Sequence, residues 1–166
     1  MIVEWNAHMF SNDLSRYPFS PNASYIPKED RWEDDPFARY QERMGTFGID
    51  RAVLVHPEPY GDDHRLVLDC LARGQGIVKV TCLFLPRDPD AVAKMIDLVA
   101  AQPDIIALRF HATHADNKFY LDSFDDDNVR ALWEKAGELG LVIELHIGPS
   151  YARQVARALG DYPDFP

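Results

Sequence analysis

Cysteine and basic residues are scarce in this sequence of 166 residues. Its two cysteines, Cys70 and Cys82, lie in apolar segments, so we expect buried free thiols in a reducing compartment rather than a disulfide or a pair of metal ligands. Seventeen lysines and arginines face 27 acidic residues, which gives a net charge of −10. Because such an acidic surface repels phosphates and anionic headgroups, we expect neither nucleic-acid nor membrane partners.

Long apolar runs are also lacking. No stretch of about 18 apolar residues could cross a bilayer. The opening residues, Met1–Trp5, have neither the basic segment nor the apolar run of a secretory signal. The sequence has no glycine-rich phosphate loop, no nucleophile elbow and no Cys–His pair of catalytic character. We therefore expect a cytoplasmic protein. We do not expect it to use a phosphate-binding loop, a serine nucleophile on an elbow, or a Cys–His pair.

Short segments rich in Val, Ile and Leu alternate with segments of helical periodicity. The short segments are apolar on both faces, which predicts a parallel sheet covered by helices. Most of the helical segments follow Asp or Ser and end near Gly, as helices do. The expected strands are Ile2–His8, Ala52–Pro57, Val78–Leu85, Ile105–His111 and Leu141–Ile147. The expected helices are Phe37–Phe47, His64–Arg73, Asp90–Ala101, Val129–Leu139 and Tyr151–Leu159, the last closed by Gly160.

Five βα units suit two α/β architectures. One is a (β/α)8 TIM barrel, which usually needs about 250 residues, with its first five βα units present here. The alternative is an open, five-stranded, doubly wound parallel sheet. In either case we expect a single α/β domain over residues 1–166. After Gly160 the sequence is typical of the approach to another strand, so we expect this domain to be the N-terminal part of a larger barrel.

Residues 11–34 have no periodicity and carry three prolines, which predicts a long loop after the first strand. A loop of that length in a compact domain usually has a function, here that of a lid. Its aromatic residues either cover a pocket or pack down on the end of the barrel; they are Tyr17, Phe19, Tyr25 and Trp32.

Histidines mark the ends of the expected strands. Four of the six close a strand, and they are His8, His56, His111 and His146. Loops and helix N-termini converge at the carboxyl ends of parallel strands, and functional sites lie there. The positions of these histidines therefore predict a pocket at one end of the sheet.

Polar residues recur at every second position within three of these strands, and side chains two apart share one face of a strand. The groups expected to share a face are Glu4, Asn6 and His8, then Arg109 and His111, then Glu144 and His146. Burying ionisable groups costs free energy unless they pair or bind a ligand. Any single histidine could be a hydrogen-bonded core residue, but the whole set indicates a functional pocket.

The remaining polar features are weaker signals. We expect His64, at a helix start, on the solvated surface, and we interpret Asp125–Asp127 as complementing a helix dipole rather than binding a cation. His114 lies in a polar loop and could belong to the site or to the loop alone. Asn6 and His8 have the spacing of two ligands to one metal, but asparagine is a poor ligand for zinc-like metals.

Several stretches in order resemble one family, and they are Ile2–Phe10, Gly48–Val55, Ala107–His111, Leu132–Glu134 and Gly140–His146. They are similar to the amidohydrolase-related metal-dependent hydrolases of TIM-barrel fold, whose first strand carries an acidic-x-His-x-His signature. The resemblance covers essentially the whole chain and is closest to the branch of dicarboxylate and sugar lactonases and aromatic-acid decarboxylases.

The resemblance implies roles for individual residues. His8 and His146 would face the active centre and are the candidate metal ligands, while His56, Arg109 and His111 would contact substrate. Two departures stand out: Asn6 replaces the first histidine of the signature, and the family's sixth-strand His and eighth-strand Asp would lie beyond Pro166. Some lactonases of the branch work without metal, so one divalent metal (Zn or Mn) and no metal both remain open.

Our leading hypothesis is a hydrolase that cleaves a small anionic, lactone-like or amide-like carbonyl compound by water attack. His8, His111 and His146 would be catalytic, with His8 orienting the water and the other two polarising the carbonyl. Substrate binding would use Asn6, His56, Arg109 and Glu144, with Arg109 gripping a carboxylate. The alternatives are a non-oxidative decarboxylase, with His56 or Glu58 as the discriminating neighbour, and a catalytically silent binding protein. For the chain alone we expect association into a homo-oligomer.

Overall fold

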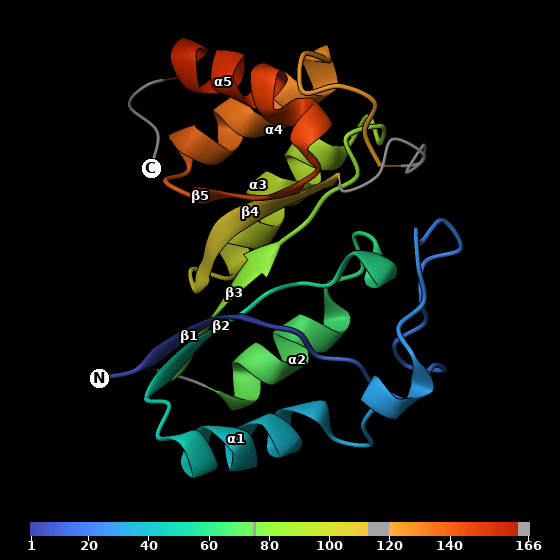
Figure 1. Ribbon diagram of the computed structural model, residues 1–166, viewed down its shortest axis with the longest axis vertical. Helices are drawn as coiled ribbons and strands as arrows, with labels where there is room; N and C mark the ends of the chain where they lie inside the picture. The colour runs from blue at the N-terminus through green and yellow to red at the C-terminus, as the bar shows by residue number, and fades with distance from the viewer. Residues whose placement is uncertain (75, 113–119, 163–166) are drawn as a thin grey trace. The chain divides into compact units, whose positions relative to one another are not determined.

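The computed structural model describes residues 1–74, 76–112 and 120–162, which fall into two compact units (Figure 1). Unit 1 is Met1–Cys82 and unit 2 is Leu83–Pro166. His114 and the last four residues lie outside the described residues, so the expectations for them stay predictions.

The described residues of unit 1 form three parallel strands and two α-helices. The strands β1 (Val3–Ala7), β2 (Arg51–Leu54) and β3 (Val78–Cys82) pair in chain order. Helix α1 (Pro36–Phe47) connects the first two strands, and α2 (Arg65–Arg73) connects the next two and packs on β3. Short 3-10 turns lie at Glu29–Arg31 and Glu58–Tyr60. Each strand is shorter than the apolar segment that predicts it.

In unit 2, the part of the chain that the structure describes forms two parallel strands and three α-helices. Strands β4 (Ile105–Ala112) and β5 (Val142–Ile147) pair over six residues of each. The helices are α3 (Ala91–Ala101), α4 (Asp127–Glu138) and α5 (Ala152–Asp161), which follows a 3-10 turn at Pro149–Tyr151. Helix α4 packs on β5 and on α3. Its buried Trp133 stacks on Phe110 of β4, with ring centroids 5.7 Å apart. The predicted alternation of strands and helices is therefore confirmed in both units.

The helix ends follow the sequence signals in part, and α5 has Tyr151 rather than the preceding serine at its N-cap position. Asp35 caps α1 by accepting a 2.9 Å hydrogen bond from the Ala38 amide, and Gly48 ends that helix at φ 65°. At α2 the N-cap position is taken by His64, while Asp63 accepts from the Arg65 amide. The expected stop at Gly160 is wrong, because α5 continues to Asp161.

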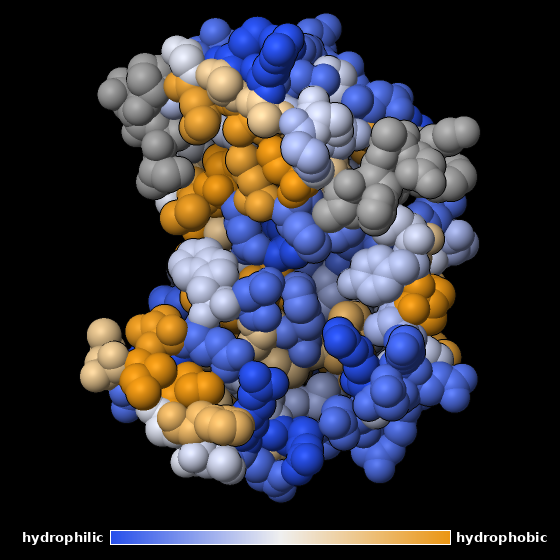
Figure 2. Space-filling view, in the orientation of Figure 1, coloured by the Kyte–Doolittle hydropathy of each residue, from blue (hydrophilic) through white to orange (hydrophobic). Residues whose placement is uncertain are grey.

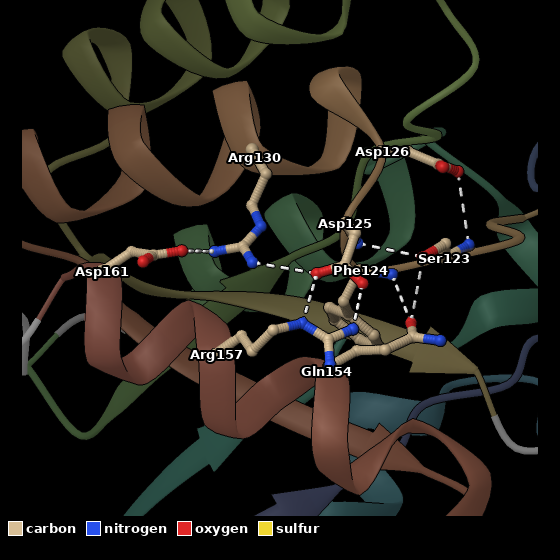
Figure 3. A network of polar contacts seen from close by, with 8 residues as sticks. All are labelled: Ser123, Phe124, Asp125, Asp126, Arg130, Gln154, Arg157 and Asp161. Atoms are coloured by element: carbon tan, nitrogen blue, oxygen red, sulfur yellow. Dashed lines mark hydrogen bonds and ion pairs between the residues drawn. The ribbon is translucent and has the colours of Figure 1, made fainter.

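The acidic run before α4 joins two helices of unit 2 (Figure 3). The Asp125 carboxylate accepts hydrogen bonds from Arg157 of α5 and, at 3.1 Å, from Arg130 of α4. Gln154 of α5 accepts a 2.8 Å bond from the Phe124 amide just before the run. Asp126 occupies the N-cap position and Asp127 the first turn of α4, as dipole complementation predicts. Asp125 itself is engaged by arginines instead.

Apolar side chains reach the surface along β1, next to the end of α1, and they form one of the apolar areas visible in Figure 2. Trp5 is 43% exposed and Phe47 is 66% exposed, and the first three residues are also exposed. In unit 2, no residue of β5 is fully buried. Both cysteines are buried free thiols, as expected, and burial raises the pKa of each to about 12.

The long loop packs on unit 1 through most of its aromatic residues. Tyr17 is buried and its hydroxyl bonds to Asp69 of α2. Phe19 contacts Trp32 and Tyr60, with ring centroids 5.5 and 5.0 Å away. Tyr25 differs, because it is 43% exposed. Tyr17 and Phe19 therefore contact residues outside the loop and Trp32 contacts Phe19 within it, while the lid function of residues 11–34 stays a prediction.

Candidate active site

The four strand-end histidines lie where the sequence places them. His8 directly follows β1, and His56 follows β2 by two residues. His111 and His146 are the penultimate residues of β4 and β5. Two of them belong to unit 1 and two to unit 2, and each pair is described within its own unit.

Strand register builds a polar cluster at the end of β4 and β5. In the parallel ladder Arg109 lies opposite Glu144, and His111 lies opposite His146. Arg109 Nη1 donates to Glu144, while Arg109 Nη2 donates to Nδ1 of His146 at 2.8 Å. The rings of His111 and His146 meet edge to face, with centroids 4.6 Å apart. The structure therefore brings together the four polar residues predicted on these two strands.

Burial shapes the electrostatics of this cluster. Arg109 is 4% exposed, and its ion pair with Glu144 offsets part of the cost of removing its charge from water. The Tyr120 hydroxyl donates a 3.1 Å hydrogen bond to the Arg109 carbonyl. Burial, and then the neighbouring positive charge of Arg109, lower the pKa of His146 below its usual value. His146 is thus held neutral at pH 7 beside a permanently charged guanidinium.

The first strand departs from regular alternation. Its register against β2 shifts between Trp5 and Ala7, and Asn6 has a φ of 97°. Glu4 accepts a 2.8 Å hydrogen bond from the hydroxyl of Tyr40 on α1. The expectation that Glu4, Asn6 and His8 share one face by simple alternation is therefore wrong, because a bulge lies between them.

His8 lies beside two pockets of unit 1. Its Nδ1 donates to the Val55 carbonyl at 3.0 Å, which leaves Nε2 as the acceptor nitrogen of the neutral ring. The larger pocket, of about 640 Å³, is lined by His8, Arg31, Arg39 and Arg43 among others. The smaller one, of about 340 Å³, includes His8, Tyr25 and Lys28. Sequence reasoning missed these cations, although Arg39 and Arg43 have the i, i+4 spacing of one helix face.

His56 is part of the interior of unit 1. It is 1% exposed, its ring Nε2 donates to the Gly61 carbonyl at 2.8 Å, and its amide donates to Thr81 at 3.1 Å. His64, expected on the surface, is buried instead, with its ring 4.4 Å from that of His56. Helix α2 starts against the chain after β2, so the His64 ring turns inward. Burial, and then His64, lower the pKa of His56 well below its usual value.

Glu58, two residues further on, is also buried. Its carboxylate accepts hydrogen bonds from the amide and hydroxyl of Ser24, at 3.0 and 2.9 Å respectively. Burial raises the pKa of Glu58, and these hydrogen bonds oppose that rise. Glu58 thus holds the long loop through Ser24, a contact between distant segments that local sequence patterns do not reveal.

The comparisons with known proteins place these residues in a family. A sequence model described as the amidohydrolase family matches residues 6–166. Among curated proteins, 4-sulfomuconolactone hydrolase from Hydrogenophaga intermedia is 27% identical over 161 residues. That match covers 93% of this chain and 48% of the relative, so the chain spans about half the length of the curated protein it matches.

Solved structures match the fold over nearly the whole chain. One, from Acinetobacter baumannii with citric acid bound, is described as a probable 2-pyrone-4,6-dicarboxylic acid hydrolase and has a TM-score of 0.74 at 16% identity, covering 99% of this chain and 55% of its own. A second so described, from Pseudomonas putida, has a TM-score of 0.73 at 23% identity, covering 96% and 53%. The predicted fold, the first five βα units of a TIM barrel, is thereby confirmed.

Two further structures of this fold contain metal. An amidohydrolase from Burkholderia multivorans holds zinc (TM-score 0.62, 14% identity, 98% of this chain and 53% of its own). A 5-carboxyvanillate decarboxylase from Novosphingobium aromaticivorans holds manganese (TM-score 0.58, 14% identity, 99% and 56%). Metal binding is thus known on this scaffold.

The donor chemistry of the described residues does not fit a metal centre. Among them, no group of three His, Cys, Asp or Glu side chains converges as ligands. His8 has a suitable neutral form, with Nδ1 bonded to a carbonyl. His146 does not, because its Nδ1 accepts from Arg109 and its Nε2 therefore carries the proton.

No helix in the described part of the chain is long and apolar enough to cross a membrane.

Proposed function

Because this chain belongs to the amidohydrolase family, we propose that its protein is a hydrolase that opens a small anionic, lactone-like carbonyl compound by attack of water. The observation that carries this proposal is the cluster of Arg109, Glu144, His111 and His146 at the ends of two neighbouring strands. The similarity to a sulfomuconolactone hydrolase supports the choice of a lactone.

In this reaction negative charge develops on the carbonyl oxygen when water attacks. A hydrogen-bond donor fixed in advance near that oxygen lowers the barrier, and removing one such donor typically costs about 10²–10³ in kcat. His146 can supply this donor from Nε2, because its Nδ1 already accepts from Arg109. His111, whose ring lies against that of His146, is the second candidate donor.

The preference for an anionic substrate has separate support in unit 1. The net charge of −10 repels anions from most of the surface, so an anionic substrate needs local positive charge. Three arginines line the larger pocket together with Glu33 and Glu42, which leaves an excess of one positive charge, and Lys28 and Arg31 outnumber Asp30 at the smaller pocket. Arg39 and Arg43 are paired with Glu42 and Glu4, so Arg31 is the arginine of the larger pocket that has no ion pair with a carboxylate among the described residues. Guanidinium groups bind carboxylates and sulfonates through paired hydrogen bonds.

A non-oxidative decarboxylase is the second candidate. Structures described as 5-carboxyvanillate decarboxylases share the fold, with TM-scores of 0.58. The hydrolase is favoured because the curated relative at 27% identity is a lactone hydrolase, whereas the decarboxylase structures are 16% and 14% identical. The third alternative, a catalytically silent binding protein, would retain ligand binding without turnover.

A substrate comparison tests the proposal. The protein is incubated with 4-sulfomuconolactone, with 2-pyrone-4,6-dicarboxylate and with 5-carboxyvanillate, and ring opening or CO₂ release is followed. We expect ring opening of a lactone, with kcat reduced about 10²–10³-fold in His146→Ala, which removes the donor. Lys135→Gln, a half-buried lysine of α4 paired with Glu138, is the control and should keep full activity. CO₂ release without lactone opening would favour the decarboxylase, and binding without turnover the silent protein.

A further inference from the structure

Arg109 makes two directed contacts that determine the protonation pattern of a neighbouring histidine. A guanidinium has hydrogen-bond donors and no acceptor. The 2.8 Å contact from Arg109 Nη2 therefore requires an unprotonated Nδ1 on His146. A neutral imidazole carries a single proton, so the proton of His146 lies on Nε2. The hydrogen bond thus selects one of the two tautomers of His146.

We propose that Arg109 is a positioning residue that Glu144 holds in place, and that it fixes His146 with its proton on Nε2, from which it donates a hydrogen bond to the substrate's carbonyl oxygen. The tautomer follows from the contacts of Arg109, and only the role toward substrate rests on the proposed hydrolase function. This differs from the role expected from sequence, in which Arg109 grips a substrate carboxylate directly.

The environment of Arg109 favours positioning over substrate binding. Its guanidinium is occupied by Glu144 at Nη1 and by His146 at Nη2, and the residue is 4% exposed. A substrate carboxylate would have to displace the protein's own Glu144 from a nearly buried ion pair. Removing one partner of such a pair leaves a buried charge uncompensated, which is strongly unfavourable.

The neighbouring strand supports the geometry. The ladder places Arg109 opposite Glu144, and His146 stands two residues beyond Glu144 on the same strand. Because residues two apart share a strand face, one guanidinium can reach both side chains at once. The edge-to-face ring of His111 packs against His146 from the opposite strand position, which restricts rotation of the imidazole.

The tautomer is measured directly by long-range proton–nitrogen correlation NMR of the whole protein, rather than of the 166-residue chain alone, labelled in its histidine rings. Loss of one signal set in His146→Asn assigns the resonances. We expect an unprotonated Nδ1 and a protonated Nε2 for His146 at neutral pH. A protonated Nδ1 in the wild-type chain would overturn the proposal, whether or not the protein hydrolyses lactones.

Two variants separate positioning from general structural support. Arg109→Gln replaces a pure donor by an amide that can donate or accept, so we expect signals of both His146 tautomers. Glu144→Gln keeps an oxygen that accepts from Arg109, so the Nε2-protonated form should persist. Arg157→Gln, which changes an arginine of α5 bonded to Asp125, is the matched control and should leave the tautomer unchanged. An unaltered tautomer in Arg109→Gln would contradict the proposal.

The kinetic signature also differs between the two roles. If Arg109 positions His146, Arg109→Gln should lower kcat roughly 10- to 100-fold, as loss of an outer hydrogen-bond partner of a functional histidine does, with little change in KM. If Arg109 grips the substrate, KM should rise instead. A KM effect alone would overturn the positioning role, whereas absence of lactone hydrolysis in wild type would reject the proposed function and leave the NMR result standing.

Discussion

At the scale of single residues, the hydrogen-bond partner decides what each histidine can do. His8 donates Nδ1–H to the Val55 carbonyl and keeps Nε2 as an acceptor, whereas His146 accepts at Nδ1 and donates from Nε2. His56 is buried and donates Nε2–H to Gly61. All three occupy similar places at strand ends, so residue type and position alone do not distinguish their chemistry.

The first residue-scale prediction concerns metal. We expect weak affinity for zinc, because Asn6 is a poor ligand and Nε2 of His146 carries its proton. Protein loaded with zinc should lose it on dialysis against a mild chelator, as measured by metal analysis. Zinc retained in a one-to-one ratio would contradict this and would require a ligand not identified among the described residues.

The second residue-scale prediction concerns the buried histidine of unit 1. The pKa of His56 is lowered well below its usual 6.5, so the unfolded chain binds its proton first as pH falls. The stability contributed by the neutral ring is present above about pH 6.5 and is lost as the pH falls below that value, with a slope of at most roughly 1.4 kcal/mol per pH unit. The free energy of unfolding, measured with urea at several pH values between 7 and 5, should fall less steeply with falling pH in His56→Gln than in wild type. Equal slopes would show that His56 protonates as readily in the folded state.

At the scale of elements, helix ends could be predicted from the sequence, whereas the partners of each strand residue depend on strand register. Asp35 and Gly48 delimit α1 as the sequence predicts, because capping depends on local chemistry. The bulge in β1 was not predicted, since it depends on how that strand pairs with β2. The β4–β5 register brings Arg109 to Glu144 and His146. The period-two pattern predicted which residues share a face within each strand, but not which residues of the two strands bond to one another.

Gly45 within α1 and Gly48 directly after it provide a matched test of where this helix ends. Gly48 has a φ of 65°, and a Cβ added there would meet nothing within 4 Å. Gly48→Ala should therefore cost about 1–2 kcal/mol from conformation alone. Gly45 lies inside the same helix and is equally uncrowded. Gly45→Ala should therefore raise the free energy of unfolding by about 0.5–1 kcal/mol. Chemical denaturation measures both, and changes of the same sign would contradict the assigned end of α1.

At the scale of the whole molecule, strands β1 and β5 both carry exposed apolar side chains. Among the described residues, β1 pairs only with β2, and β5 pairs only with β4. Trp5 on β1 and Val142 on β5 are exposed, and the matched curated relative is about twice as long as this chain. Strand edges with apolar side chains readily pair with another chain.

We therefore expect the 166-residue chain, expressed alone, to dimerise or aggregate. Each 100 Å² of apolar surface left in water forgoes about 2.5 kcal/mol, a large part of the ~5–15 kcal/mol that stabilises a domain. Sedimentation velocity over a range of concentrations measures this directly. A stable monomer that melts cooperatively would contradict the expectation and would show that the two strand edges are tolerated in water.

By itself the sequence determined the alternation of strands and helices, the buried thiols, and the position of a histidine at the end of each of four strands. These features depend on periodicity, capping and hydrophobicity, which act over a few neighbouring residues. Only the tertiary structure decided that His64 is buried, that Asn6 lies in a bulge, and that Arg109 binds Glu144 and His146. Those outcomes depend on contacts between segments far apart in the chain, because strand register and helix packing choose each side chain's partner.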